Sequence, residues 1–186
     1  MDDEFLATAN ENVTPLSYDK WNAIGFSWAD PFRGDRVDQF LVDSKKFTMQ
    51  DMIDLQVDYY SPPAFYLTGM LSGLINYDEN FLKEYDDYIW RLIKWDNNLN
   101  KNSVEATIYV NWERNIINEF NKEYVPEKVK GLVRVQLFKI INKLYNMDEN
   151  LRNNFLKKTF ISSINDLKSK FGDKIDEFVY GQDGYK

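Results

Sequence analysis

Apolar residues recur at intervals of three and four along most of the chain after residue 34, which is the spacing of one helix face. The clearest stripe is Phe81, Leu82, Tyr85, Ile89, Leu92 and Ile93. Residues that favour helix starts precede several stripes: Thr48, Ser61 before Pro62-Pro63, Asp78, Ser103 and Asp148. The pattern also predicts a helix from Pro126 to Leu144 and separate helices over residues 148–155 and 160–171, the last one ending at Gly172.

Residues 1–33 lack this periodicity and contain Pro15, Gly25 and Pro31. Leu6–Ala9 and Ile24–Phe26 could form short extended pieces there. The sequence therefore predicts a mainly α fold, a helical bundle with an irregular N-terminal arm. We expect the arm to cover residues 1–33 and the helical domain to cover 34–186, with two helical layers dividing near 97–102.

Composition excludes several kinds of chemistry. The 186 residues include no Cys and no His, which rules out Ser-His-Asp and Cys-His nucleophiles, Cys/His zinc sites and disulfide scaffolds. A net charge of −7 and a pI near 4.7 argue against nucleic acid as a partner. No apolar stretch is long enough for a membrane span, and the acidic N-terminus does not resemble a signal peptide.

Most polar clusters are better explained as structure than as sites. In Gly69–Gly73 the serine, Ser72, stands one position later than a G-x-S-x-G nucleophile turn requires. Asp86 and Asp87 are adjacent, so on a helix they point in different directions and cannot act as a catalytic pair.

Trp90, Trp95 and Trp112 fall on or near apolar stripes, so we expect them in the core rather than around a ligand. Asp87 and Arg91, four residues apart, are expected to pair.

Two segments of the N-terminal third are less ordinary. Polar side chains, including Asn10 and Asn12, follow a short apolar segment, and Arg33 and Arg36 lie at a predicted helix start. The helix dipole disfavours cations there, so another interaction must hold them. Turn-forming amides and a structural arginine–carboxylate pair would explain both segments; a functional site is the alternative.

At these residues the chain resembles the penicillin acylase (penicillin amidase) family of N-terminal-nucleophile hydrolases. The resemblance is carried by four ordered stretches: Phe5–Asn12 (FLATANEN), Trp28–Val37 (WADPFRGDRV), Phe47–Met52 with Gln56, Asp58 and Ser61, and Trp95-Asp96 with Ser103, Ala106 and Trp112. From Ile116 onward only the helical pattern matches. Near the end Phe178–Gly181 (FVYG) is similar to a family motif, but Gly184 stands where that motif has His.

The resemblance implies hydrolysis of a linear amide to a carboxylic acid and an amine. In the family an N-terminal Ser attacks the carbonyl with its own α-amino group as base, which fits a chain without His. By position, Asn10 matches the family Asn whose amide donates to the oxyanion, and Arg36 matches an Arg that orders the site beside the nucleophile. Both are expected as catalytic residues, and Arg33 and Trp28 as substrate-binding residues.

The resemblance also implies what this chain lacks. It has no N-terminal Ser, so we expect it to be the helical middle of the larger subunit, a fragment of a larger α+β enzyme that is inactive alone. The expected partners are the remainder of the penicillin amidase subunits and a small acyl-amide substrate, with self-association of the exposed interior surface. No cofactor is expected, since the family calcium site lies outside the chain. Family members are often extracytoplasmic, but any signal would lie upstream. A free-standing helical interaction module is the alternative.

Overall fold

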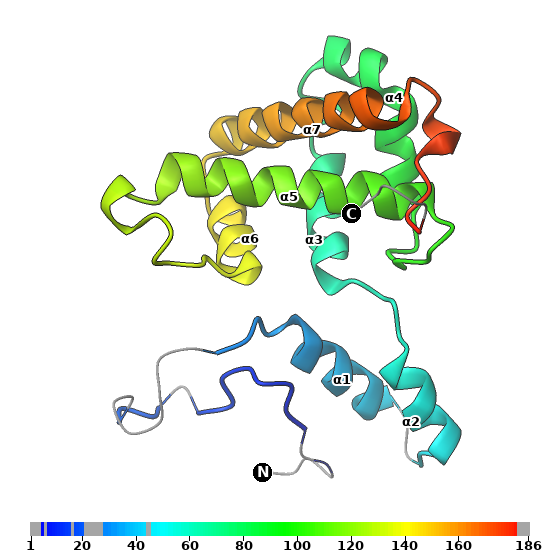
Figure 1. Ribbon diagram of the computed structural model, residues 1–186. Coiled ribbons are helices and arrows are strands. Elements are labelled where there is room, and N and C mark those ends of the chain that lie inside the picture. Colours follow the sequence, from blue (N-terminus) through cyan, green and yellow to red (C-terminus); the bar gives the residue numbers. More distant parts are fainter. Residues whose placement is uncertain (1–4, 6, 16, 21–27, 44–45, 182–186) are drawn as a thin grey trace. The chain divides into compact units, whose positions relative to one another are not determined.

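The computed structural model describes residue 5 and residues 7–15, 17–20, 28–43 and 46–181. Over these ranges the chain forms seven α-helices and no β-strand, which confirms the predicted mainly α fold. The chain divides into two compact units, Met1–Asp58 and Tyr59–Lys186 (Figure 1). The boundary predicted after residue 33 and the division predicted near 97–102 stay predictions.

The first unit contains two helices, α1 (Phe32–Asp43) and α2 (Met49–Gln56). Thr48 begins α2 as predicted, in a reciprocal capping box in which its side chain accepts from the Asp51 backbone N–H and its own N–H donates to the Asp51 carboxylate. The rings of Phe40 in α1 and Phe47, two residues before α2, stack with their centroids 5.4 Å apart. Residues 7–9 are not a strand, and Leu6 and Ile24–Phe26 lie outside the described residues.

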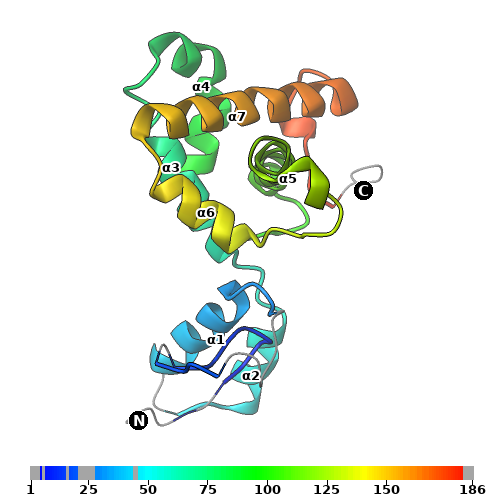
Figure 2. The same cartoon turned by 90° about the vertical axis from the view of Figure 1, so that its left-hand side faces the viewer.

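The second unit is a bundle in which α7 crosses α5 (Figures 1 and 2) and α3 packs against both α4 and α6. Short 3₁₀ turns lie at Glu127–Val129 and Ile175–Glu177. The five helices are α3 (Pro62–Ser72), α4 (Glu79–Lys94), α5 (Val104–Tyr124), α6 (Leu137–Tyr145) and α7 (Glu149–Phe171).

The core of this bundle lies between α5 and α7. Trp112 and Phe160 are fully buried and meet edge to face at 5.4 Å. The Trp112 indole N–H donates to the Thr159 hydroxyl at 3.1 Å, so the polar edge of the ring is satisfied inside the apolar contact. Trp112 is therefore a core residue, as its position on an apolar stripe predicted.

Most helix starts follow the local signals. Ser61, Asp78, Ser103 and Asp148 all accept backbone N–H bonds as N-caps, and Gly172 ends α7 at φ +88°. Two predicted boundaries are wrong. Gly131, at φ +84°, interrupts the helix predicted from Pro126, so α6 begins only at Leu137. The two helices predicted over residues 148–155 and 160–171 form one continuous helix, α7.

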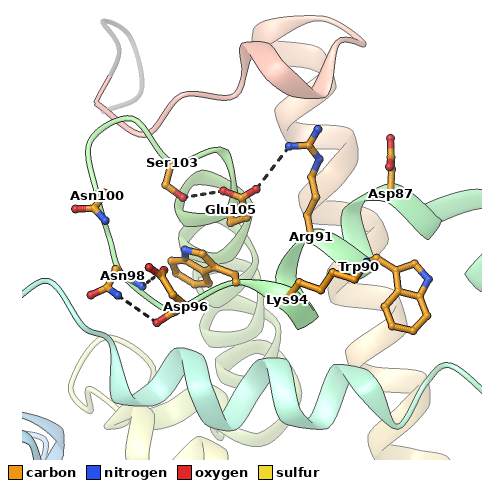
Figure 3. A pocket seen from close by; sticks show the side chains of 10 residues that line it. Asp87, Trp90, Arg91, Lys94, Asp96, Asn98, Asn100, Ser103 and Glu105 are labelled. Atoms are coloured by element: carbon orange, nitrogen blue, oxygen red, sulfur yellow. Dashed lines mark hydrogen bonds and ion pairs between the residues drawn. The ribbon is translucent and has the colours of Figure 1, made fainter.

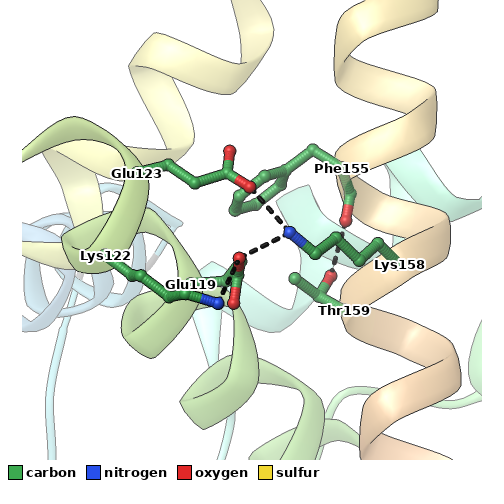
Figure 4. A network of polar contacts seen from close by, with 6 residues as sticks. All are labelled: Glu119, Lys122, Glu123, Phe155, Lys158 and Thr159. Atoms are coloured by element: carbon green, nitrogen blue, oxygen red, sulfur yellow. Dashed lines mark hydrogen bonds and ion pairs between the residues drawn. The ribbon is translucent and has the colours of Figure 1, made fainter.

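At the edge of the α5–α7 interface, Lys158 forms ion pairs with Glu119 and Glu123, and we call these three residues the Lys158 clamp (Figure 4). The Lys158 ammonium on α7 lies 2.5 Å from a Glu119 oxygen and 2.8 Å from a Glu123 oxygen, both on α5. The hydrogen bond from Lys158 holds the pKa of the Glu119 carboxyl below its usual value, and the bond to Glu119, followed by the one to Glu123, raises the pKa of Lys158. The clamp therefore favours the charged form of both partners.

Among the helices described here, none combines the length and the apolar character that a membrane span requires.

Candidate functional site

Asn10 occupies an unusual backbone position in the N-terminal arm. Its φ is +73°, a left-handed conformation that Asn tolerates better than most residues. Its carbonyl accepts a 2.8 Å hydrogen bond from the N–H of Ala29, so the backbone at Asn10 is tied to the segment that leads into α1. The side chain of Asn10 is exposed and therefore accessible to a ligand.

Arg33, the second residue of α1, reaches back to this position. Its Nη2 donates to the carbonyl of Ala9 at 2.6 Å and to Oδ1 of Asn10 at 2.7 Å. A guanidinium has donors and no acceptor, so the amide oxygen must face it and the NH₂ end of the amide must point elsewhere. The arrangement presents a neutral hydrogen-bond donor from a fixed backbone.

A carboxylate also supports this turn. Glu11 Oε2 accepts from the N–H of Ala9 at 2.7 Å. The same carboxylate lies against Gly34, where an added Cβ would stand 2.6 Å from Glu11 Cδ, so the absence of a side chain permits this approach. Nearby, burial and then the charges of Asp38, Glu11 and Asp30 raise the pKa of Asp35. The first turn of α1 is thus bordered by several acidic groups.

Arg36 takes a different partner. Its Nε lies 2.6 Å from Asp58 Oδ2, and the two side chains are 33% and 19% exposed. The sequence analysis offered a structural arginine–carboxylate pair as one explanation for the arginines at this helix start, and Arg36 forms such a pair. Trp28 is half-buried and immediately precedes Ala29, the residue whose N–H bonds to Asn10. All four predicted site residues therefore lie in the first unit, and Arg33 contacts Asn10 directly.

The penicillin amidase profile matches residues 1–182 of this sequence. The chain belongs to the penicillin amidase family. No curated protein matches it. Membership agrees with the resemblance found in the four motif stretches and connects the chain with a family of hydrolases.

The structure joins two penicillin amidase motif segments that are far apart in sequence. The N–H of Tyr180 donates to the carbonyl of Ser103 at 3.2 Å, and that of Gly181 donates to the carbonyl of Lys101 at 2.6 Å. A Cβ on Gly181 would stand 2.9 Å from the Lys101 carbonyl oxygen, so this close approach requires glycine. The FVYG segment is therefore packed on the loop that begins α5.

A second candidate site is a cavity of about 630 Å³ in the second unit, between the end of α4, the 95–103 loop and the start of α5 (Figure 3). Among its charged groups, Arg91 and Glu105 form an ion pair at 3.5 Å, and Arg91 also bonds to Asp176 at 2.7 Å rather than to the predicted Asp87. The lining consists of Asp87, Trp90, Arg91, Lys94, Trp95, Asp96, Asn98, Asn100, Ser103 and Glu105.

Two of the tryptophans predicted in the core contribute to this cavity instead. Trp90 is 37% exposed, with the Lys94 ammonium 5.7 Å from its ring centroid, so its assignment to the core is wrong. Trp95 is half-buried and packs on Tyr109 at 5.5 Å. Trp90 follows the stripe residue Ile89, and periodicity alone could not separate a core position from its exposed neighbour.

The described residues contain no group of three or more acidic, His or Cys side chains arranged to hold a metal ion. The expectation that the calcium site of the family lies outside this chain stays a prediction.

Proposed function

We propose that residues 1–186 form the helical part of an amide-hydrolysing penicillin amidase and that Asn10 supplies an oxyanion donor. The observation that carries the proposal is the bond from Arg33 to Asn10 Oδ1, which directs the NH₂ end of the amide away from Arg33. Acyl transfer develops negative charge on the carbonyl oxygen, and a donor fixed beforehand stabilises that charge. Family membership supports the reaction class.

In this proposal the nucleophile comes from a part of the enzyme outside residues 1–186. It attacks the carbonyl carbon of a small acyl-amide, and the C–N bond of the tetrahedral intermediate breaks to leave an acyl-enzyme and the amine, which takes up the proton of the nucleophile. Water then adds to the acyl-enzyme, which releases the acid and restores the nucleophile. Arg36, held by Asp58 at 2.6 Å, orders the wall beside the nucleophile, and Trp28 contributes an apolar surface to the acyl group. The chain by itself would not hydrolyse the amide.

The test is the turnover of Asn10 variants of the whole enzyme. Asn10→Ala should lower kcat by roughly 10²–10³-fold with little change in KM, which is the usual effect of losing one oxyanion donor. Asn10→Asp should be at least as damaging, because a carboxylate repels the oxyanion. The Asp variant still tolerates a left-handed backbone and can accept from Arg33, so its thermal stability should remain close to that of the parent.

Asn12→Ala is the matched control, because Asn12 is an exposed amide two residues away whose Oδ1 accepts from Thr14. It should retain near-parental turnover. Near-normal kcat in Asn10→Asp, with folding verified by thermal melting, would remove Asn10 from the site and leave it a turn residue.

A second candidate, a helical interaction module without chemistry, is favoured by the surface of α2. None of its residues is buried, and Met49, Ile53 and the following Val57 are 78%, 47% and 56% exposed at four-residue spacing. An exposed stripe of this kind marks a contact surface. Within the leading proposal the remainder of the penicillin amidase subunits covers it, and in the separated chain it leads to self-association. The Asn10 assay distinguishes the two functions, since a module without chemistry would give no turnover either with Asn10 or with Ala in its place.

A further inference from the structure

We propose that Arg33 is a positioning residue that selects which end of the Asn10 side chain faces the reacting carbonyl. The inference rests on the proposed function of Asn10 and adds a residue to it. It differs from the substrate-binding role that the sequence predicted for Arg33. The two roles make different kinetic predictions and can be separated.

The amide of Asn10 needs an external group to fix its orientation. The last torsion of an Asn side chain is broad and roughly two-fold, so the oxygen and the NH₂ group can exchange places with little steric cost. The two orientations are chemically opposite, because one presents donors and the other an acceptor. An acceptor directed at a developing oxyanion would repel it, so only one orientation is competent.

Arg33 removes the ambiguity. Its Nη2 lies 2.7 Å from Asn10 Oδ1, and turning the amide over would place NH₂ against a guanidinium that has no acceptor. The same Nη2 donates to the Ala9 carbonyl at 2.6 Å, so Arg33 fixes both the side chain and the backbone that carries it. With the Ala29 N–H bonded to the Asn10 carbonyl, the main chain is held on both sides.

The placement of Arg33 within α1 supports this reading. A cation in the first turn of a helix is disfavoured by the dipole, and Arg33 is exposed, so burial does not hold it there. Its two charge-assisted bonds to the arm offset that cost. A cation bound to the amide oxygen also polarises the amide and strengthens its N–H groups as donors. Arg33 thus acts on the oxyanion through Asn10.

The kinetic test is a double-mutant cycle between Arg33 and Asn10 in the whole enzyme. Arg33→Met removes every donor and keeps an unbranched apolar stem. It should lower kcat by roughly 10–100-fold and leave KM nearly unchanged, because the donor is present but misplaced. In the Asn10→Ala background the same change should alter kcat by less than about 2-fold, because no amide remains to be positioned.

Other outcomes overturn the proposal. An equal loss of kcat in both backgrounds indicates a structural role, and a rise in KM in both backgrounds with kcat unchanged indicates substrate binding. Arg33→Lys retains a donor-only head group and should recover most of the lost kcat. If Arg33→Met does not fold, the cycle is run with Arg33→Gln, whose amide carries both a donor and an acceptor and cannot impose one orientation.

A second readout does not depend on catalysis. In the ¹⁵N-labelled 186-residue chain, the side-chain amide of Asn10, assigned by its loss in Asn10→Ala, should be rigid in the parent and mobile in Arg33→Met. The Asn12 amide, bonded to Thr14, is the internal reference. Arg134→Met is the matched variant, since Arg134 is an exposed arginine of the other compact unit.

An Asn10 amide that remains equally ordered without Arg33 would falsify the positioning role. If Asn10→Ala has near-normal turnover while the amide still loosens in Arg33→Met, the oxyanion function is wrong and the contact is only structural.

Discussion

The indole N–H of Trp112 and the hydroxyl of Thr159 form a 3.1 Å hydrogen bond between two fully or almost fully buried side chains. The Thr159 hydroxyl also lies 3.0 Å from the carbonyls of Phe155 and Leu156 of its own helix, so it can accept from the indole while donating to its backbone. This one hydroxyl therefore joins α5 and α7 within their apolar contact.

Thr159→Val should destabilise the chain by about 1–3 kcal/mol, because it keeps the shape of the side chain but leaves the buried indole N–H without an acceptor. Urea unfolding measures the change. Ser162→Ala is the control: Ser162 is exposed on the same helix, and losing its hydroxyl should shift stability by less than about 0.5 kcal/mol. Equal effects of the two changes would show that the indole bond contributes nothing.

The Lys158 clamp predicts a dependence of stability on pH. The pKa of Glu119 is lowered in the folded chain, so its contribution is complete above the ordinary glutamate pKa and is lost as pH falls through the lowered value. At pH 7, Glu119→Gln should cost roughly 1 kcal/mol or less, as expected for a partly exposed ion pair. At about pH 3, below the ordinary glutamate pKa, the difference from the parent should be smaller than at pH 7.

Urea unfolding at both pH values tests this. Lys158→Met should remove most of the same pH-dependent difference, because the hydrogen bond from Lys158 is the largest of the interactions that lower the pKa of Glu119, to which Lys122 also contributes. A Glu119→Gln difference that is the same at both pH values would contradict the assignment.

Gly181 and Gly69 should respond to alanine in opposite directions. A Cβ on Gly181 would stand 2.9 Å from both Cβ and the carbonyl oxygen of Lys101, so Gly181→Ala must move the FVYG segment and should cost about 1–3 kcal/mol. Gly69 is exposed inside α3 with open space around the added carbon, so Gly69→Ala should stabilise by roughly 0.5–1 kcal/mol.

Chemical unfolding gives both values. Hydrogen exchange at the Gly181 amide, which bonds to Lys101, should accelerate in Gly181→Ala only. A Gly181→Ala chain as stable as the parent would show that the FVYG contact is not needed.

Local rules predicted the helix starts well because each cap involves residues within four positions of one another. The capping box of Thr48 and Asp51 and the cap at Ser103 needed no tertiary information. The start of α6 was missed because Val129, Leu132 and Val133 continue the helical spacing through Gly131. Gly131, at φ +84°, interrupts the helix, and Leu132, which the spacing placed on an apolar face, is 82% exposed.

The contacts of the candidate site were beyond such rules. Arg33 and Asn10 are 23 positions apart, and Arg36 and Asp58 are 22 apart, so neither pairing follows from local spacing. The pairing of Arg91 could not be predicted from local spacing either. Its acidic partners are Glu105 at the start of α5 and Asp176 near the C-terminus, rather than Asp87 one turn away. The family resemblance identified Asn10, and only the fold shows what holds its amide.

Asp58 is the last residue of the first compact unit and the carboxylate partner of Arg36, and this decides where a gene encoding that unit should stop. Truncation at Gln56, where α2 ends, would preserve both helices and still remove Asp58, which pairs with Arg36 at 2.6 Å. A recombinant first unit should therefore extend through residue 58. A shorter one would lose the Arg36–Asp58 ion pair in the unit that carries the amide proposed to act.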